Sequence, residues 1–390
     1  MMRSTETPAG RQHPGSLQPV TGREAVILDD RKATMSTSPN LPGRLGNPDF
    51  DIKDDPRADP RMIAAMAELG MDVAPPPSPV TAANTIDELL DYCVEAEAGF
   101  DALGGVVVAK TTPVTAVSSY TEVINGVDGN DINLYIHRPD AVVGPVPCIV
   151  HTHGGGMAIL KAANPNYVRW RDDLAATGMV VIGVEFRNAA GALGPYPFPA
   201  GLNDCASGAQ WAIANRDALG ISKVIISGES GGGNLSIATA LKAKQDGWID
   251  DIDGVYAQCP YISNAYADPI AALTSLFEND DYFLNVENMG ALAKTYDPDG
   301  ANATNPLAWP MHAEPSDLDG LPPHVISVNQ LDPLRDEGLV YYRKLLDAGV
   351  SAVSRTVNGT CHAGDCLFLD AMPDVWYATI RDIKGFADSL

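Results

Sequence analysis

The sequence is poor in basic residues and contains no long apolar run. Its 390 residues include 26 Lys and Arg against 50 Asp and Glu, which gives a formal net charge of −24. Nucleic acids and anionic membrane surfaces repel such a chain, so we expect it to bind neither. No apolar stretch approaches the roughly 18 residues that a membrane-spanning helix needs. The N-terminus, MMRSTETPAGRQHPG, also lacks the apolar core of a secretory signal, which favours a cytoplasmic protein.

Cysteines are few and show no pairing pattern. The six cysteines form no C-x-x-C motif, and several lie in apolar runs such as VPCIV. This arrangement is typical of buried, reduced thiols in a cytoplasmic protein. A zinc site is not expected, because no His and Cys residues have ligand spacing and H-E-x-x-H does not occur. We therefore infer no metal and no organic cofactor.

The N-terminal region has little apolar periodicity. Residues 1–57 are rich in Pro, Gly, Ser, Thr and Asp, and we predict a mobile tail there. An arm that lies on a partner subunit is the alternative. Met35 opens a second plausible start, so the sequence leaves open whether residues 1–34 belong to the native protein.

Helices and a hairpin are predicted next. Residues 58–110 contain a short helical pattern and then a longer one, in which Thr85 and Glu88 form a T-x-x-E capping box. The runs SSYTEVIN and INLYIHRP follow, and they flank a turn that contains Asp128-Gly129. This pattern predicts a β-hairpin.

Strands and helices alternate from Pro145 onwards. Apolar runs such as PCIVHTH, MVVIGVEF and KVIISGES are each followed by a helical stretch. The pattern predicts an α/β protein with a mostly parallel central sheet and helices on both faces. We assign its first part to residues 111–263 and its second part to 321–390. Residues 264–320 break the rhythm and are interpreted as an insertion over the sheet edge.

The strongest local motif is GESGG at residues 228–232. It follows the strand-like run KVIIS and precedes a helical stretch, which is the context of a nucleophile elbow. Glycine at 228 and 232 avoids clashes in such a tight turn. The turn would place Ser230 at a helix N-terminus, where developing negative charge is favoured. A glycine-rich turn that merely begins a helix is the alternative.

A second motif, HGGG at residues 153–156, follows the run PCIVHT. Three consecutive glycines cost backbone entropy, so a site that needs bare backbone is indicated. We predict an oxyanion hole formed by the N–H groups of Gly154, Gly155 and Gly231. A flexible loop is the alternative. A phosphate cradle is disfavoured because the P-loop pattern does not occur.

A serine nucleophile needs a base, and the chain has seven histidines. His362 is preferred because it follows the last predicted strand, in a loop with Gly359 and Gly364 that would lie at the same sheet end as Ser230. Position alone does not eliminate His312. The other histidines lie in the tail, the hairpin, the glycine motif or at the start of a strand: His13, His137, His151, His153 and His324.

The base in turn needs an orienting carboxylate. Asp332 lies at the carboxyl end of the run HVISVNQ, and Pro333 stiffens the turn after it. Asp336 is the second choice, although it falls in the next predicted helix. The chain order Ser230, Asp332, His362 is that of the α/β-hydrolases.

Together, HGGG, GESGG, DPLRDE and a histidine near the C-terminus resemble the bacterial hormone-sensitive-lipase family of α/β-hydrolases, over roughly residues 60–390. The resemblance implies the same nucleophile, base, orienting acid and oxyanion donors: Ser230, His362, Asp332, Gly154, Gly155 and Gly231. It also implies a cap over the cleft, built from the N-terminal helices (58–110) and the insertion (264–320), and a homodimer.

Two features depart from the family pattern. Many relatives carry GDSAGG, whereas this chain has Glu229 and Gly231. Cys361 lies directly beside the predicted base, where simple packing is the main interpretation and a redox-sensitive site the alternative. Neither departure removes a reacting group.

These patterns predict a serine carboxylesterase that hydrolyses small or medium esters through an acyl-enzyme. A lactone hydrolase with the same machinery is the main alternative, and amide hydrolysis is disfavoured because no further leaving-group acid is visible. A hydrolase fold that only binds its ligand is disfavoured because no triad member is missing. By adjacency to the motifs, the predicted pocket residues are Met157, Tyr196, Tyr261 and Phe283.

Overall fold

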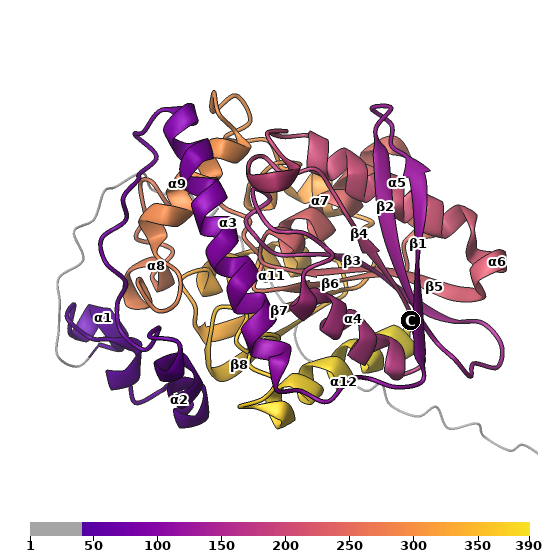
Figure 1. Ribbon diagram of the computed structural model, residues 1–390. Coiled ribbons are helices and arrows are strands. Elements are labelled where there is room, and N and C mark those ends of the chain that lie inside the picture. Colours follow the sequence, from indigo (N-terminus) through magenta and orange to yellow (C-terminus); the bar gives the residue numbers. More distant parts are fainter. Residues whose placement is uncertain (1–40) are drawn as a thin grey trace, which may run out of the picture. The chain divides into compact units, whose positions relative to one another are not determined.

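The computed structural model describes residues 41–390 and contains one eight-stranded sheet (Figure 1). From β3 to β8 all neighbouring strands are parallel, and β1 and β2 add an antiparallel edge. In sheet order the strands are β1 (Val117–Asn125), β2 (Asp131–Pro139), β4 (Val180–Val184), β3 (Val146–Thr152), β5 (Ile221–Glu229), β6 (Gly254–Gln258), β7 (His324–Leu331) and β8 (Ala352–Cys361). The predicted α/β class and hairpin are confirmed.

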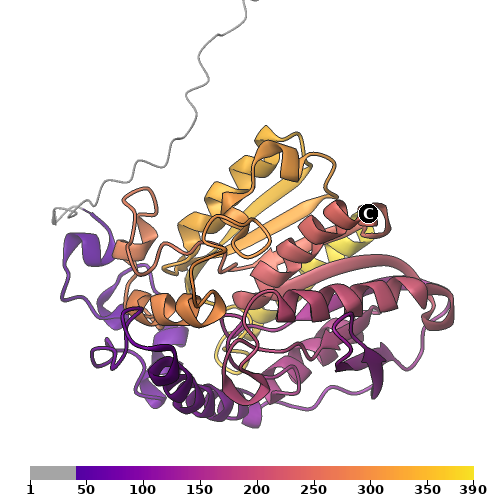
Figure 2. The same cartoon turned by 90° about the horizontal axis from the view of Figure 1, so that it is seen from above.

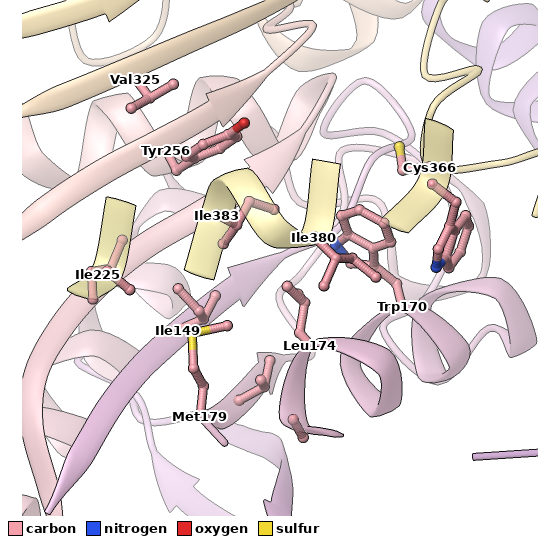
Figure 3. Packing of buried hydrophobic residues seen from close by; sticks show 14 of the residues in the cluster. Ile149, Trp170, Leu174, Met179, Ile225, Tyr256, Val325, Cys366, Ile380 and Ile383 are labelled. Carbon is pink, nitrogen blue, oxygen red and sulfur yellow. The ribbon is translucent and has the colours of Figure 1, made fainter. Parts of the chain in front are cut away.

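Helices cover both faces of the sheet (Figures 1 and 2). On one face, α4 and α12 pack on Ile149, Ile225 and Val325 (Figure 3). The next residue of β7, Ile326, points to the opposite face, where it meets α11 beside Gly338. The core helices are α4 (Pro165–Ala176), α5 (Ala200–Ala214), α6 (Arg216–Leu219), α7 (Gly231–Asp246), α11 (Arg335–Asp347) and α12 (Pro373–Ser389).

The strands are apolar on both faces because helices cover both. All residues of β4 and β6 are buried, and β5 is buried from Val224 onwards. Such continuous apolar runs are typical of parallel strands inside an α/β fold. Because β3, β5, β7 and β8 are parallel, their carboxyl ends meet at one edge of the sheet, and Ser230, Asp332 and His362 directly follow β5, β7 and β8 there.

The long N-terminal helix α3 (Ile86–Ala109) lies beside α9 (Val286–Tyr296), which belongs to the insertion between β6 and β7 (Figures 1 and 2). The predicted capping box begins α3, since the Thr85 N–H donates to Glu88 Oε2 at 2.9 Å and the Thr85 hydroxyl accepts from the Glu88 N–H. The remaining elements are α1 (Gly43–Gly46), η1 (Ile52–Asp54), α2 (Pro60–Glu68), η2 (Gly191–Leu193), η3 (Ile249–Asp251), α8 (Ser275–Glu278), η4 (Pro310–His312) and α10 (Pro315–Leu318).

The prediction of a tail up to residue 57 is wrong for residues 41–57. This segment contains α1 and η1, and the side chains of Leu45 and Ile52 are buried. Arg57 pairs with Asp55 at 2.6 Å and also with Glu278. The composition did not indicate a folded segment here, because ion pairs with residues far along the chain hold much of it in place. The rest of the predicted tail, residues 1–40, lies outside the described residues.

None of the helices in residues 41–390 combines the length and apolar character that a membrane span requires.

Candidate active site

Ser230 occupies a strained turn between β5 and α7. Its φ of 58° and ψ of −119° are unusual for a non-glycine residue. Neighbouring backbone leaves no room for side chains on either flank: a Cβ on Gly228 would lie 2.2 Å from the Thr152 carbonyl oxygen, and one on Gly232 only 1.9 Å. Both positions therefore require glycine because neighbouring backbone approaches them closely, as the sequence predicted.

His362 and Asp332 form a buried pair at the ends of β8 and β7. The distance from His362 Nδ1 to Asp332 Oδ2 is 2.8 Å, and Asp332 Oδ1 accepts from the Leu334 N–H at 2.9 Å. Because an ionised carboxylate only accepts, this contact places the proton of a neutral imidazole on Nδ1 and leaves Nε2 as an acceptor. Both side chains are almost completely buried.

Ser230 and His362 line one cavity of about 100 Å³. The two alternatives that the sequence left open lie elsewhere. Asp336 accepts from the Ser275 N–H at 2.9 Å and pairs with Arg335. His312 hydrogen-bonds to Asn264 at 3.0 Å and does not line the cavity.

The glycine motif is organised by Glu229, whose role the sequence analysis missed. The Gly154 N–H donates to Glu229 Oε1 at 2.9 Å, and Glu229 Oε2 lies 3.0 Å from His151 Nε2. The Gly154 amide is therefore already engaged, which does not fit its predicted role as an oxyanion donor. The sequence signal that could have indicated this role is the carboxylate directly before Ser230.

Three other glycine amides, those of Gly155, Gly156 and Gly231, belong to the backbone near Ser230. A Cβ on Gly231 would lie 2.7 Å from the Gly156 nitrogen, so this backbone approaches the elbow closely. Gly155 and Gly156 line the cavity. Within residues 41–390, no acceptor receives a hydrogen bond from the N–H of Gly155, Gly156 or Gly231. These donors are free to bind an incoming oxygen atom.

His153, the first residue of the glycine motif, is a packing residue. Its ring stacks on Phe186 with centroids 4.1 Å apart, and Nδ1 lies 2.7 Å from the Gly154 carbonyl oxygen. Complete burial lowers the pKa of His153 to about 3, so the ring is neutral.

The cavity wall is mainly apolar, and α3, α9 and the loops near them supply much of it. Phe283 lies in this wall, as predicted. The other principal apolar residues are Phe100, Leu103, Ile159, Leu160, Tyr167, Leu284, Met289, Leu292 and Leu367. Sequence adjacency to the motifs could not identify the residues of α3, because α3 lies far from those motifs along the chain.

Three predicted pocket residues are not part of this wall. Tyr196 is 48% exposed and its ring lies near the Arg187 guanidinium. Tyr261 is buried and its hydroxyl donates to the Met289 carbonyl oxygen at 2.5 Å. Met157 is buried behind the elbow, where its backbone nitrogen approaches Gly231.

The cysteines near the base are buried. The Cys361 thiol is fully buried, and burial raises its pKa well above the ordinary value. Cys259 Sγ lies within 4.8 Å of ligand atoms of both Asp332 and His362, a grouping that is able to hold a metal ion. Burial likewise raises the pKa of the Cys259 thiol, which disfavours the thiolate that a metal would need.

Comparison with known sequences gives one consistent answer. A protein-family model described as the alpha/beta hydrolase fold matches residues 149–364. An arylesterase of Saccharolobus solfataricus is 34% identical over 218 residues, which cover 55% of this chain and 67% of the relative. The carboxylesterase NlhH of Mycobacterium tuberculosis is 30% identical over 273 residues, which cover 68% of this chain and 81% of the relative.

Solved structures agree over nearly the whole described chain. Brefeldin A esterase, a bacterial homologue of human hormone-sensitive lipase, superposes with a TM-score of 0.85 and 44% identity, covering 89% of this chain and 98% of that one. The esterase Est22 superposes with a TM-score of 0.78 and 39% identity, covering 87% and 99%. The chain therefore belongs to the α/β-hydrolase family, among its hormone-sensitive-lipase-like esterases.

Proposed function

We propose that this protein is a serine carboxylesterase that works through an acyl-enzyme, with Ser230 as nucleophile, His362 as general base and Asp332 as the orienting acid. The observation that carries the proposal is the shared cavity: a strained serine and the imidazole of a 2.8 Å His–Asp pair open onto the same apolar space. The esterase relatives support the reaction class.

The reaction begins when the Ser230 hydroxyl attacks the ester carbonyl carbon while His362 Nε2 takes its proton. The carbonyl oxygen becomes an oxyanion and accepts hydrogen bonds from the free amides of Gly155, Gly156 and Gly231. His362 then gives the proton to the departing alkoxide. Water then hydrolyses the acyl-enzyme, with His362 again acting first as base and then as acid. Asp332 holds the neutral imidazole in the required tautomer and stabilises the imidazolium when His362 carries the proton.

The cavity favours small or medium esters. Its volume of about 100 Å³ accommodates a short acyl or alcohol group, and its walls offer apolar contact. We propose that α3 and α9 act as the cap over this space. Because Phe283 and Leu292 line the cavity, the length of the accepted group should depend on their side chains.

A cyclic ester would meet the same nucleophile and the same amides, so lactone hydrolysis is the second candidate. The strong structural match to brefeldin A esterase is the observation that favours testing it. The ratio of kcat/KM for a lactone to kcat/KM for a linear ester of equal carbon number separates the two activities.

The proposed nucleophile is tested by Ser230→Ala. We expect kcat for a p-nitrophenyl acyl ester to fall at least about 10³-fold, because removal of a triad nucleophile eliminates the acyl-enzyme route. The thermal midpoint should change little, because the alanine keeps the backbone of the turn. A fluorophosphonate should label the wild-type protein at residue 230 and leave the variant unlabelled. Substantial turnover by the variant would show that the assignment is wrong, and an unlabelled wild type would favour a ligand-binding protein.

A further inference from the structure

Residues 55–62 lie against the strand that ends one residue before the proposed base. The Asp59 N–H donates to the Gly359 carbonyl oxygen at 2.9 Å. The Met62 sulfur accepts a hydrogen bond from the N–H of Cys361, the last residue of β8, at 3.3 Å. We call residues 55–62 the N-terminal clamp. Through Arg57 the clamp also contacts α8 and Asn279, and Asn279 in turn contacts the end of the neighbouring strand β7.

Arg57 is the central cation of the clamp. Its side chain is 17% exposed, and it pairs with Asp55 at 2.6 Å and with Glu278 of α8. The Arg57 Nη2 group also donates to Asn279 Oδ1 at 3.1 Å. One guanidinium therefore holds two buried carboxylates and an amide oxygen at once, which its planar fork of donors permits and a lysine would not.

This contact fixes the orientation of the Asn279 amide. A guanidinium only donates, so the amide oxygen must face Arg57 and the NH₂ group must face the other way. On that side the Asn279 Nδ2 group donates to the carbonyl oxygens of Gln330 at 3.2 Å and Asp332 at 3.1 Å. Asn279 thus holds the backbone of Asp332, while the Asp332 carboxylate holds His362.

A second arginine completes the same network. Arg335 makes two hydrogen bonds of 2.9 Å to Glu278 and donates to the Gln330 carbonyl oxygen at 3.0 Å. Burial alone would raise the pKa of Glu278, but the hydrogen bonds and charges of Arg335 and Arg57 outweigh it and lower the pKa. Glu278 is therefore an ionised link between the clamp and the backbone around Asp332.

We propose that Arg57 is a positioning residue for the reaction: through Asn279 it fixes the main chain of Asp332 and so the geometry of the Asp332–His362 pair. This inference rests on the proposed function, because it assigns that pair its role. Neither Arg57 nor Asn279 lines the cavity, so their contribution should affect the chemical steps and not substrate binding.

Two variants test the clamp. Arg57→Lys keeps the charge and loses the fork that reaches three acceptors. Asn279→Asp has the same shape and still accepts from Arg57, but it presents an oxygen in place of the NH₂ group to the two backbone carbonyls. For both we expect kcat to fall about tenfold while KM for a p-nitrophenyl ester stays within twofold. If Arg57→Lys does not fold, kcat and KM of Asn279→Asp alone test the inference.

Arg61→Lys is the matched control, since Arg61 lies in the same segment but its ion pairs with Asp59 and Asp374 are exposed. It should keep kcat within twofold. A folded Asn279→Asp variant with wild-type kcat, or equal losses in the control, would overturn the inference. Fluorophosphonate labelling of the wild type separates the two hypotheses: labelling at Ser230 with no kcat effect in the variants rejects the clamp alone, whereas absent labelling rejects the proposed function.

Discussion

At the scale of single residues, the buried Glu229 carboxylate connects the elbow to the glycine loop. Its two oxygens serve two buried partners, the Gly154 amide and the His151 ring. A carboxylate at this position does not need to touch the substrate to affect catalysis. It holds the backbone that presents the neighbouring free amides to the cavity, because Gly154 directly precedes Gly155.

Glu229→Ala should therefore lower both stability and turnover. The change leaves two buried polar groups without partners, which costs about 1–3 kcal/mol of unfolding free energy each. We expect kcat to fall about 10–100-fold as the loop loses its anchor. Glu229→Gln keeps an acceptor for Gly154 and should lose far less. Ester turnover and urea unfolding of both variants check this, and full activity in Glu229→Ala would refute the anchoring role.

The sequence predicted the position of those residues that are fixed by chain order and strand ends, while their catalytic roles stay a proposal. Asp332 and His362 follow β7 and β8, and topology alone brings such ends together. The Gly154 amide and Tyr196 were misassigned for a different reason: their environments depend on a side chain or a loop path that no periodicity encodes. Sequence patterns do not predict hydrogen bonds between a side chain and remote backbone, such as the one between Glu229 and the Gly154 N–H.

At the scale of elements, glycine has opposite consequences in the elbow and in α3. A Cβ at Gly232 would lie 1.9 Å from a backbone oxygen, whereas nothing lies within 4 Å of a Cβ at Gly99 in α3. The sequence predicted the first from its motif. The sequence could not predict that Gly99 has no neighbouring side chain, because the position of α9 decides which face of α3 stays uncovered.

Gly232→Ala and Gly99→Ala should thus change stability in opposite directions. We expect Gly232→Ala to lose more than about 3 kcal/mol of unfolding free energy, because backbone must move to admit the methyl group. Gly99→Ala should gain about 0.5–1 kcal/mol, because alanine restricts the unfolded chain and suits a helix. Urea midpoints of the two variants provide the measurement. A neutral Gly232→Ala would contradict the close packing of the elbow.

The helical packing of residues 41–57 shows the limit of composition at this scale. The composition of residues 41–57 is that of a linker, yet Arg57 forms an ion pair with Glu278, which lies more than two hundred positions away in the chain. Local patterns predict elements whose partners are apolar and periodic. They do not predict an element that is held by ion pairs to a distant insertion.

At the scale of the whole molecule, buried neutral histidines make stability depend on pH. Burial lowers the pKa of His324 to about 4, and its Nδ1 lies 2.7 Å from the Pro322 carbonyl oxygen. The unfolded histidine titrates near 6.5. Between these two values the unfolded chain binds a proton that the folded chain does not, so the unfolding free energy falls as the pH falls below about 6.5. His153, with its pKa lowered to about 3, acts in the same direction.

His324 allows this effect to be isolated, because it begins β7 at the sheet end opposite the site. On going from pH 7 to pH 5, the difference between pKa values of about 6.5 and 4 corresponds to a loss of about 2 kcal/mol from this residue. His324→Asn retains a donor for the Pro322 carbonyl and does not titrate, so it should lose less stability over the same interval by about that amount. Carboxylates also titrate in acid, but they contribute equally to both proteins and cancel in the comparison. Urea unfolding of both proteins at pH 7 and pH 5 gives the two differences, and equal losses would mean that the folded chain admits a proton at residue 324.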